Sequence, residues 1–157
     1  MLAIQPQDGR GYFMLPQAPE DAGYYVYGTP GQGAGQYSHP AMLSVLFWVE
    51  HQWQATDQRR FGIGNISLAN GPVFYPHGGH RNGLQVDVRA VRLDGQHAGV
   101  RWQHAGYDRA ATDRLVGIFR THPSVIRIYF NDPEIHGVSP MINHDDHFHV
   151  EVRAGGA

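Results

Sequence analysis

The amino-acid sequence predicts an α+β fold: one domain with a small, mainly antiparallel sheet and flanking helices. Two observations lead to this prediction. Two segments carry apolar residues at helical spacing, and several short segments alternate between apolar and polar residues as strands do. The length of 157 residues is that of one ordinary domain, and neither an internal repeat nor a low-complexity linker divides it.

Two helices are predicted. The first begins after His39-Pro40, because proline suits the first helical turn and apolar residues follow at helical spacing. The second spans residues 109–120, with Asp108 as its N-cap and Pro123 just beyond its end. The apolar residues that define the two faces are Met42, Leu46, Val49 and Trp53 in the first helix and Ala111, Leu115, Ile118 and Phe119 in the second.

The remaining patterns predict strands and a distinct first segment. Residues 1–36 are rich in Gly, Pro, Gln and Tyr, and they are expected to form a strand and loop segment that packs on the domain through its aromatic side chains. Residues 37–157 are expected to form the core of the domain. Strands are predicted at residues 24–27, 62–68, 84–92, 126–131 and 147–153.

The composition excludes several classes of protein. The 12 basic and 14 acidic residues give a net charge of -2, so nucleic acid is not an expected partner. No apolar run approaches the roughly 20 residues that a membrane-spanning helix needs. Cysteine is absent, which excludes disulfides, thiolate nucleophiles and cysteine-bound zinc. The first eight residues lack the charged and apolar regions of a secretory signal, so none is expected in this sequence.

Histidine is the unusual residue type, with 11 residues, five of them in two short clusters. Residues 77–87 read HGGHRNGLQVD, and residues 144–149 read HDDHFH. Side chains two apart in a strand point to the same face, so His147 and His149 point together while Phe148 faces the core. If the strands that carry the two clusters are neighbours, Asp87 and His149 converge. The glycines of the first cluster let the chain bend so that His80 reaches the same point.

This constellation predicts a metal centre. Two neutral imidazoles and one carboxylate form a typical catalytic zinc set, with a fourth position left for water. Zinc lowers the pKa of such a water toward about 7 and polarises a carbonyl, which is the chemistry of hydrolysis. The predicted ligands are His80, Asp87 and His149, and the predicted metal is Zn²⁺.

The two clusters, in this order, resemble the LAS group of metallopeptidases. The blocks PHGGHRNGLQVD (residues 76–87) and HDDHFHV (residues 144–150) look most like those of penicillin-insensitive murein endopeptidases. His39-Pro40 at the start of a helix, with Ser67-Leu68 and Gly71-Pro72 before the first block, adds to the resemblance, which covers residues 37–153. It implies a LAS-type fold, the three zinc ligands above, and hydrolysis of peptide cross-links in bacterial peptidoglycan, such as D-alanyl-meso-diaminopimelate.

The resemblance also implies roles for the other residues of the two clusters. His144 is the general base, which takes a proton from the attacking water and returns it to the leaving amine. His147 donates a hydrogen bond to the oxyanion. His77 has a role in binding substrate or orienting a ligand, or else faces solvent in its loop. Asp146 orients an imidazole, or else belongs to a turn before the last strand.

Two other functions remain open at this point. A D-Ala-D-Ala carboxypeptidase would use the same zinc site, but in an arginine-lined pocket closed at one end. A non-catalytic module would keep zinc for folding or recognition, although metal binding alone does not require His144. The substrate implied by the resemblance places the action in the periplasm or cell wall. The sequence leaves open the oligomeric state and the route of delivery, whether a removed signal, phage lysis or secretion of an effector.

Overall fold

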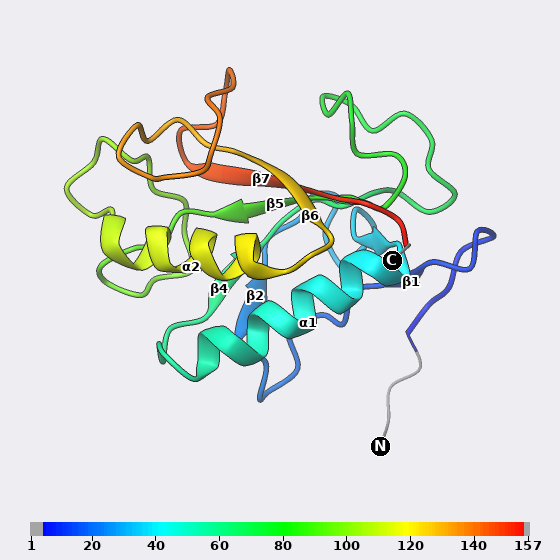
Figure 1. Cartoon of the computed structure of the whole chain (residues 1–157). Coiled ribbons are helices and arrows are strands. Elements are labelled where there is room, and N and C mark those ends of the chain that lie inside the picture. Colours follow the sequence, from blue (N-terminus) through cyan, green and yellow to red (C-terminus); the bar gives the residue numbers. More distant parts are fainter. Residues whose placement is uncertain (1–4, 156–157) are drawn as a thin grey trace.

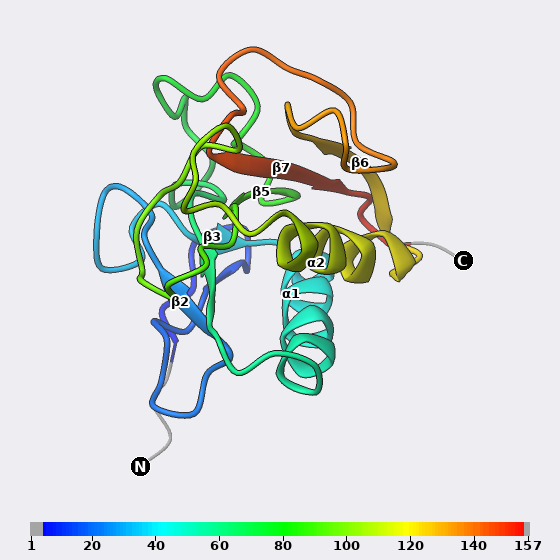
Figure 2. The ribbon, with the colours of Figure 1, turned by 90° about the vertical axis from the view of Figure 1, so that its left-hand side faces the viewer.

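In the described part of the chain, the fold consists of a main sheet with two helices on one of its faces and a small second sheet (Figures 1 and 2). It is seen in a computed structural model, which describes residues 5–155. The predicted α+β class is confirmed. The elements, in chain order, are β1 (Phe13–Met14), β2 (Tyr24–Val26), β3 (Tyr37–Ser38), α1 (Pro40–Gln54), β4 (Phe61–Ile63), β5 (Gln85–Arg89), α2 (Arg109–Thr121), β6 (Val125–Tyr129) and β7 (His147–Val152).

The main sheet has five strands in the order β2-β4-β5-β7-β6. β2 and β4 are parallel, and the three other pairs are antiparallel, so the predicted mainly antiparallel arrangement is confirmed. A separate two-stranded sheet joins β1 to β3. In the described part of the chain, no helix is long and apolar enough to cross a membrane.

Both predicted helices are confirmed, and each begins at a side chain that caps it. His39 is the N-cap of α1, where its Nδ1 accepts a hydrogen bond from the Ala41 amide at 3.0 Å and Pro40 occupies the first turn. Asp108 is the N-cap of α2 and accepts from the Ala111 amide at 3.0 Å. The buried faces consist of Met42, Val45, Leu46, Val49 and Trp53 in α1 and Ala111, Thr112, Leu115, Val116 and Phe119 in α2.

The strands are shorter than the sequence predicts. A strand over residues 62–68 is wrong in extent, because β4 ends at Ile63. Gly64 and Asn65 still bond to Asp87 of β5, but from Ile66 on the chain bonds to another segment. The Ile66 amide donates to the Gly35 carbonyl at 2.8 Å, and the Tyr37 amide donates to the Ser67 carbonyl at 2.9 Å. β5 likewise covers only part of residues 84–92, and β6 ends at Tyr129, two residues before the predicted end.

The segment before α1 contributes to both sheets. Leu15 and Tyr24 belong to the buried core, and the Leu15 amide donates to the Gln36 carbonyl at 2.9 Å. β2 forms one edge of the main sheet, and β1 pairs with β3 across the expected boundary at residue 36. Residues 1–4 of the expected segment 1–36, and residues 156–157 of the expected core 37–157, lie outside the described residues.

The sheet separates the core from the face that carries the histidines. Val88 and Phe148 are fully buried in the core cluster, and the helices cover this side (Figure 1). On the opposite side two long loops rise above the strands in both views, one before β5 (residues 64–84) and one between β6 and β7 (residues 130–146) (Figures 1 and 2). The candidate site lies between these loops.

Candidate metal centre

Antiparallel pairing of β5 and β7 brings the two histidine-containing clusters together. The two strands are neighbours, and Asp87 lies directly opposite His149 in their register. Both strands alternate as the sequence indicates, so Val86 and Phe148 enter the core while Asp87 and His149 share the other face. The Asp87 and His149 side chains are nonetheless buried, because the flanking loops cover them.

The loop before β5 carries His80 to the same point. Gly83 has a φ of +69°, and a Cβ atom there would lie 2.6 Å from the His39 amide nitrogen, so glycine is required at this turn. The His80 side chain is buried, and its Nδ1 lies 3.1 Å from the Ile66 carbonyl oxygen. A carbonyl can only accept, so Nδ1 carries the proton and Nε2 is turned toward Asp87.

Three potential ligand atoms form a small triangle. His80 Nε2 lies 3.2 Å from His149 Nδ1 and 3.3 Å from Asp87 Oδ1, and His149 Nδ1 lies 3.0 Å from Asp87 Oδ1. Ligands about 2.1 Å from a tetrahedral zinc ion are about 3.4 Å apart, so the triangle has nearly the size of one face of such a tetrahedron.

Charge at this point favours a cation. Burial raises the pKa of Asp87, but hydrogen bonds with His149 and His80 outweigh burial and hold its pKa well below the ordinary value. The carboxylate is therefore ionised, and its Oδ1 lies 3.3 Å from Nε2 of His80, the ring nitrogen that does not donate to Ile66. A proton or a metal ion between these two atoms stabilises such a close approach.

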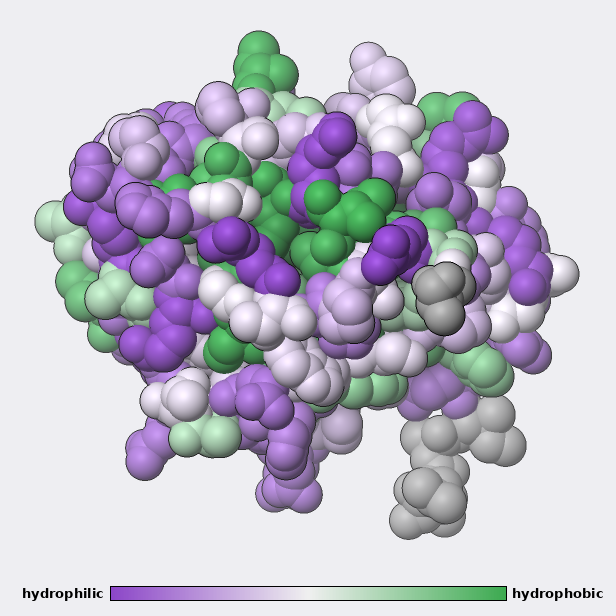
Figure 3. Space-filling model, viewed as in Figure 1, coloured by the Kyte–Doolittle hydropathy of each residue, from purple (hydrophilic) through white to green (hydrophobic). Residues whose placement is uncertain are grey.

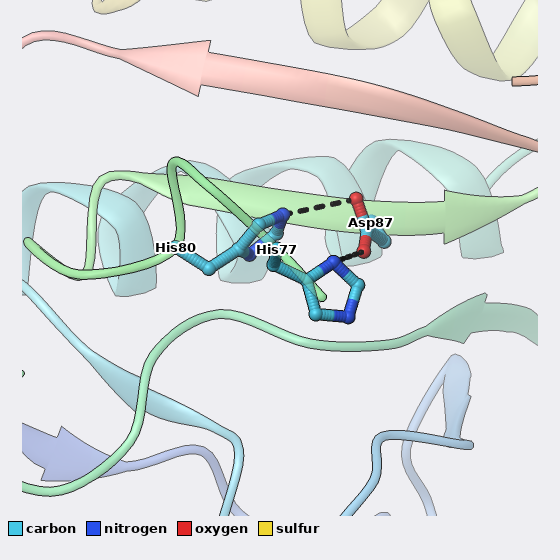
Figure 4. Close-up of side chains that lie close together, drawn as sticks. All are labelled: His77, His80 and Asp87. Atoms are coloured by element: carbon cyan, nitrogen blue, oxygen red, sulfur yellow. Dashed lines mark ion pairs between the residues drawn. The ribbon is translucent and has the colours of Figure 1, made fainter. Parts of the chain in front are cut away.

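His77 also belongs to this group. One ligand atom from each of His77, His80 and Asp87 lies within 4.8 Å of the others, so these three residues could hold a metal ion. Figure 4 shows the two histidines in the loop before β5, with contacts to the two oxygens of Asp87. His77 Nδ1 is 3.7 Å from Asp87 Oδ2. Burial lowers the pKa of His77, and so do the neighbouring imidazoles, although Asp87 opposes them.

His144 lies at the rim of the group with one free nitrogen. Its Nδ1 donates to the Ile142 carbonyl at 2.8 Å, which leaves Nε2 with a lone pair. The ring centroid is 4.8 Å from that of His147 and 5.8 Å from that of His149. Burial lowers the pKa of His144, so the ring is neutral at pH 7 and can accept a proton.

The pKa of His147 is shifted in the opposite direction to that of His144. Burial lowers its pKa, but the hydrogen bond to Asp146 and the charge of Asp87 outweigh burial, and the pKa lies above the ordinary value. His147 Nδ1 is 2.8 Å from Asp146 Oδ1, so Asp146 orients this imidazole. Asp145 points elsewhere: its Oδ1 accepts from Asn131 Nδ2 at 2.8 Å, which joins the two ends of the loop between β6 and β7.

All of these histidines line an open cleft of about 480 Å³ between the two loops. Figure 3, drawn in the view of Figure 1, shows two projections at the upper edge of the molecule with a lower stretch of surface between them. Among the described residues that line the cleft, none is arginine. Its wall also contains Gln85, Tyr129 and Glu151 from the strands and Met141 and Ile142 from the second loop.

The sequence did not single out three residues of this region. Tyr129, whose ring lies 6.0 Å from that of His149, and Glu151 share a face with His149, and strand alternation could have found both. Asn65 contacts His77 from outside any regular pattern, so no sequence signal points to it.

Comparisons with known protein families and with curated proteins do not assign the chain to a family. No known protein-family model matches the chain, and none of the curated proteins matches it.

Proposed function

We propose that this protein is a zinc-dependent endopeptidase that hydrolyses peptide cross-links of bacterial peptidoglycan. The observation that carries the proposal is the triangle of His80 Nε2, Asp87 Oδ1 and His149 Nδ1, with sides of 3.0–3.3 Å, at the base of an open cleft. The cross-link as substrate comes from the resemblance of residues 76–87 and 144–150 to murein endopeptidases.

Zinc suits this set of donors. His80, Asp87 and His149 offer two nitrogens and one oxygen, and the cleft leaves a fourth position open to water. His80 is oriented by Ile66, whose carbonyl accepts from Nδ1, and the carboxylate of Glu151 lies near His149, with Oε1 3.9 Å from Nε2. A zinc ion bound here would supply a Lewis acid that polarises the scissile carbonyl and lowers the pKa of water toward about 7.

His144 carries out the proton transfers, and His147 stabilises the oxyanion. His144 is held neutral by burial and presents an unprotonated Nε2, so it accepts a proton from the attacking water and returns it to the leaving amine. His147, whose pKa is raised by Asp146 and Asp87 against the effect of burial, donates to the oxyanion. Environments that move the pKa values of two neighbouring groups apart are typical of an acid and a base in one site.

The wall of the cleft favours an endopeptidase over the carboxypeptidase alternative. A carboxypeptidase must bind the terminal carboxylate of its substrate, and arginine is the residue best suited to that task. No arginine is found among the described residues that line the cleft. An internal peptide bond carries no such charge, so its recognition needs no cation in the wall. Peptidoglycan as substrate places the reaction in the periplasm or cell wall.

Cross-linked dimeric muropeptides test the proposal directly. Zinc-loaded protein is expected to convert dimers to monomers. His144→Gln is expected to slow the conversion about 10²–10⁴-fold, whereas His104→Gln, at an exposed histidine outside the cleft, is expected to retain it. Release of terminal D-alanine without cleavage of dimers would favour the carboxypeptidase. Zinc binding with no cleavage of any muropeptide would leave the non-catalytic module.

A further inference from the structure

Asn65 is a buried amide whose orientation is fixed by the backbone. The Thr29 amide N–H donates to Asn65 Oδ1 at 2.7 Å. An amide turned the other way would place its NH₂ group against this N–H, with two donors facing each other. The Nδ2 end therefore faces His77, whose Nε2 lies 2.8 Å away.

This contact fixes the tautomer of His77. The NH₂ group of Asn65 can only donate, so His77 Nε2 must accept and the ring proton lies on Nδ1. Nδ1 is the atom that faces Asp87 Oδ2, at 3.7 Å (Figure 4). The other oxygen of the carboxylate, Oδ1, is the one that belongs to the triangle with His80 and His149.

We propose that Asn65 and His77 are positioning residues: Asn65 holds His77 with its proton on Nδ1, and this N–H attracts the outer oxygen of Asp87 across 3.7 Å, beyond direct hydrogen-bond distance, so that Oδ1 would be presented to a bound metal ion. This inference rests on the proposed metal site and assigns the orienting role to His77. A nitrogen that carries a proton has no lone pair for a metal, so His77 Nδ1 is not a ligand in this arrangement.

The arrangement explains why the carboxylate of Asp87 would present one oxygen to a bound cation. Without a partner for Oδ2, the carboxylate of Asp87 can rotate or bind through both oxygens. Hydrogen-bonded partners of ligands commonly fix such orientations, and their loss typically lowers metal affinity 10–100-fold. Asn65 acts on Asp87 only through His77, so loss of the Asn65 side chain is expected to lower zinc affinity about tenfold.

Two substitutions of His77 separate an orienting role from a ligand role. The amide nitrogen of asparagine takes the place of Nδ1, and that of glutamine takes the place of Nε2. His77→Asn keeps a donor near Asp87 and is expected to retain zinc affinity within about threefold, whereas His77→Gln is expected to lose 10–100-fold. Affinity is measured by competition with a chelator. Equal, large losses in both variants would overturn the proposal, because they indicate that the imidazole itself binds zinc.

A measurement on the unaltered protein tests the tautomer. The ¹⁵N chemical shifts of the His77 ring are expected to show a protonated Nδ1 and an unprotonated Nε2, and Asn65→Leu is expected to remove this pattern. A proton on Nε2 in the wild-type protein would overturn the proposal even if a variant fails to fold. The ring shifts do not depend on hydrolysis, so failure to cleave muropeptides would refute the proposed function without deciding this inference.

Discussion

Replacement of Asp57 by asparagine tests the ion-pair network that joins the helices. Asp57 follows α1, and its Oδ2 lies 2.7 Å from Nη2 of both Arg59 and Arg114. Arg59 Nη1 also reaches Asp108, the N-cap of α2, at 2.9 Å. The network therefore connects the end of α1 to both the start and the middle of α2.

The pKa of Asp57 sets the size of the effect. The hydrogen bond from Arg59 lowers this pKa from 3.8 to about 2, and burial opposes it. One pKa unit corresponds to about 1.4 kcal/mol, so the network contributes about 2 kcal/mol to the free energy of unfolding at neutral pH. Because the pKa is lower in the folded state, this contribution is complete above pH 3.8 and disappears as the pH falls toward 2.

Urea unfolding of the wild type and Asp57→Asn at pH 7 and at pH 2.5 measures this contribution. We expect a difference of about 2 kcal/mol at pH 7 that shrinks to less than half at pH 2.5. Asp113→Asn, at an exposed carboxylate of α2, is the matched control and is expected to change stability by less than about 0.5 kcal/mol. A difference between wild type and Asp57→Asn that is the same at both pH values would refute the electrostatic reasoning.

Three further predictions concern the loop and the site. Gly83→Ala is expected to lower the free energy of unfolding by more than about 2 kcal/mol, because of the positive φ and the contact with the His39 backbone. Urea unfolding measures this loss. The control Gly78→Ala, where an added Cβ atom meets no other atom within 4 Å, should lower the free energy of unfolding far less. His144→Gln is expected to reduce kcat about 10²–10⁴-fold with unchanged zinc affinity, and equal loss of both would contradict its role as base. In a pH-rate profile, activity should rise as His144 loses its proton, below pH 6.5, because the base must be unprotonated. It should fall as His147 loses its proton, above pH 6.5. A profile with a single transition would contradict the assignment of these two roles.

The sequence predicts the elements in which one physical pattern dominates. Both helices carry a periodic apolar face and a capping side chain, His39 or Asp108. The predicted start of the first helix and both predicted ends of the second agree with the structure within a residue or two. The alternation in β5 and β7 predicted which side chains face the core. It also predicted that Asp87 and His149 converge if the strands are neighbours, and the register confirms this.

Contacts made only in the folded chain could not be predicted. β1 and β3 have two residues each, too few to show alternation. The apolar Ile66 extends the pattern of β4 past Ile63, but the backbone hydrogen bonds of Ile66 and Ser67 go to Gly35 and Tyr37. Asn65 is one residue before Ile66 and 12 before His77, and only the turn of the chain brings its amide to the imidazole.

Anomalous scattering at the zinc absorption edge, from crystals of zinc-loaded protein, tests the central claim most directly. We predict one strong peak about 2.0–2.2 Å from His80 Nε2, His149 Nδ1 and Asp87 Oδ1. A peak bound elsewhere on the chain, or none between these three atoms at saturating zinc, would contradict the claim.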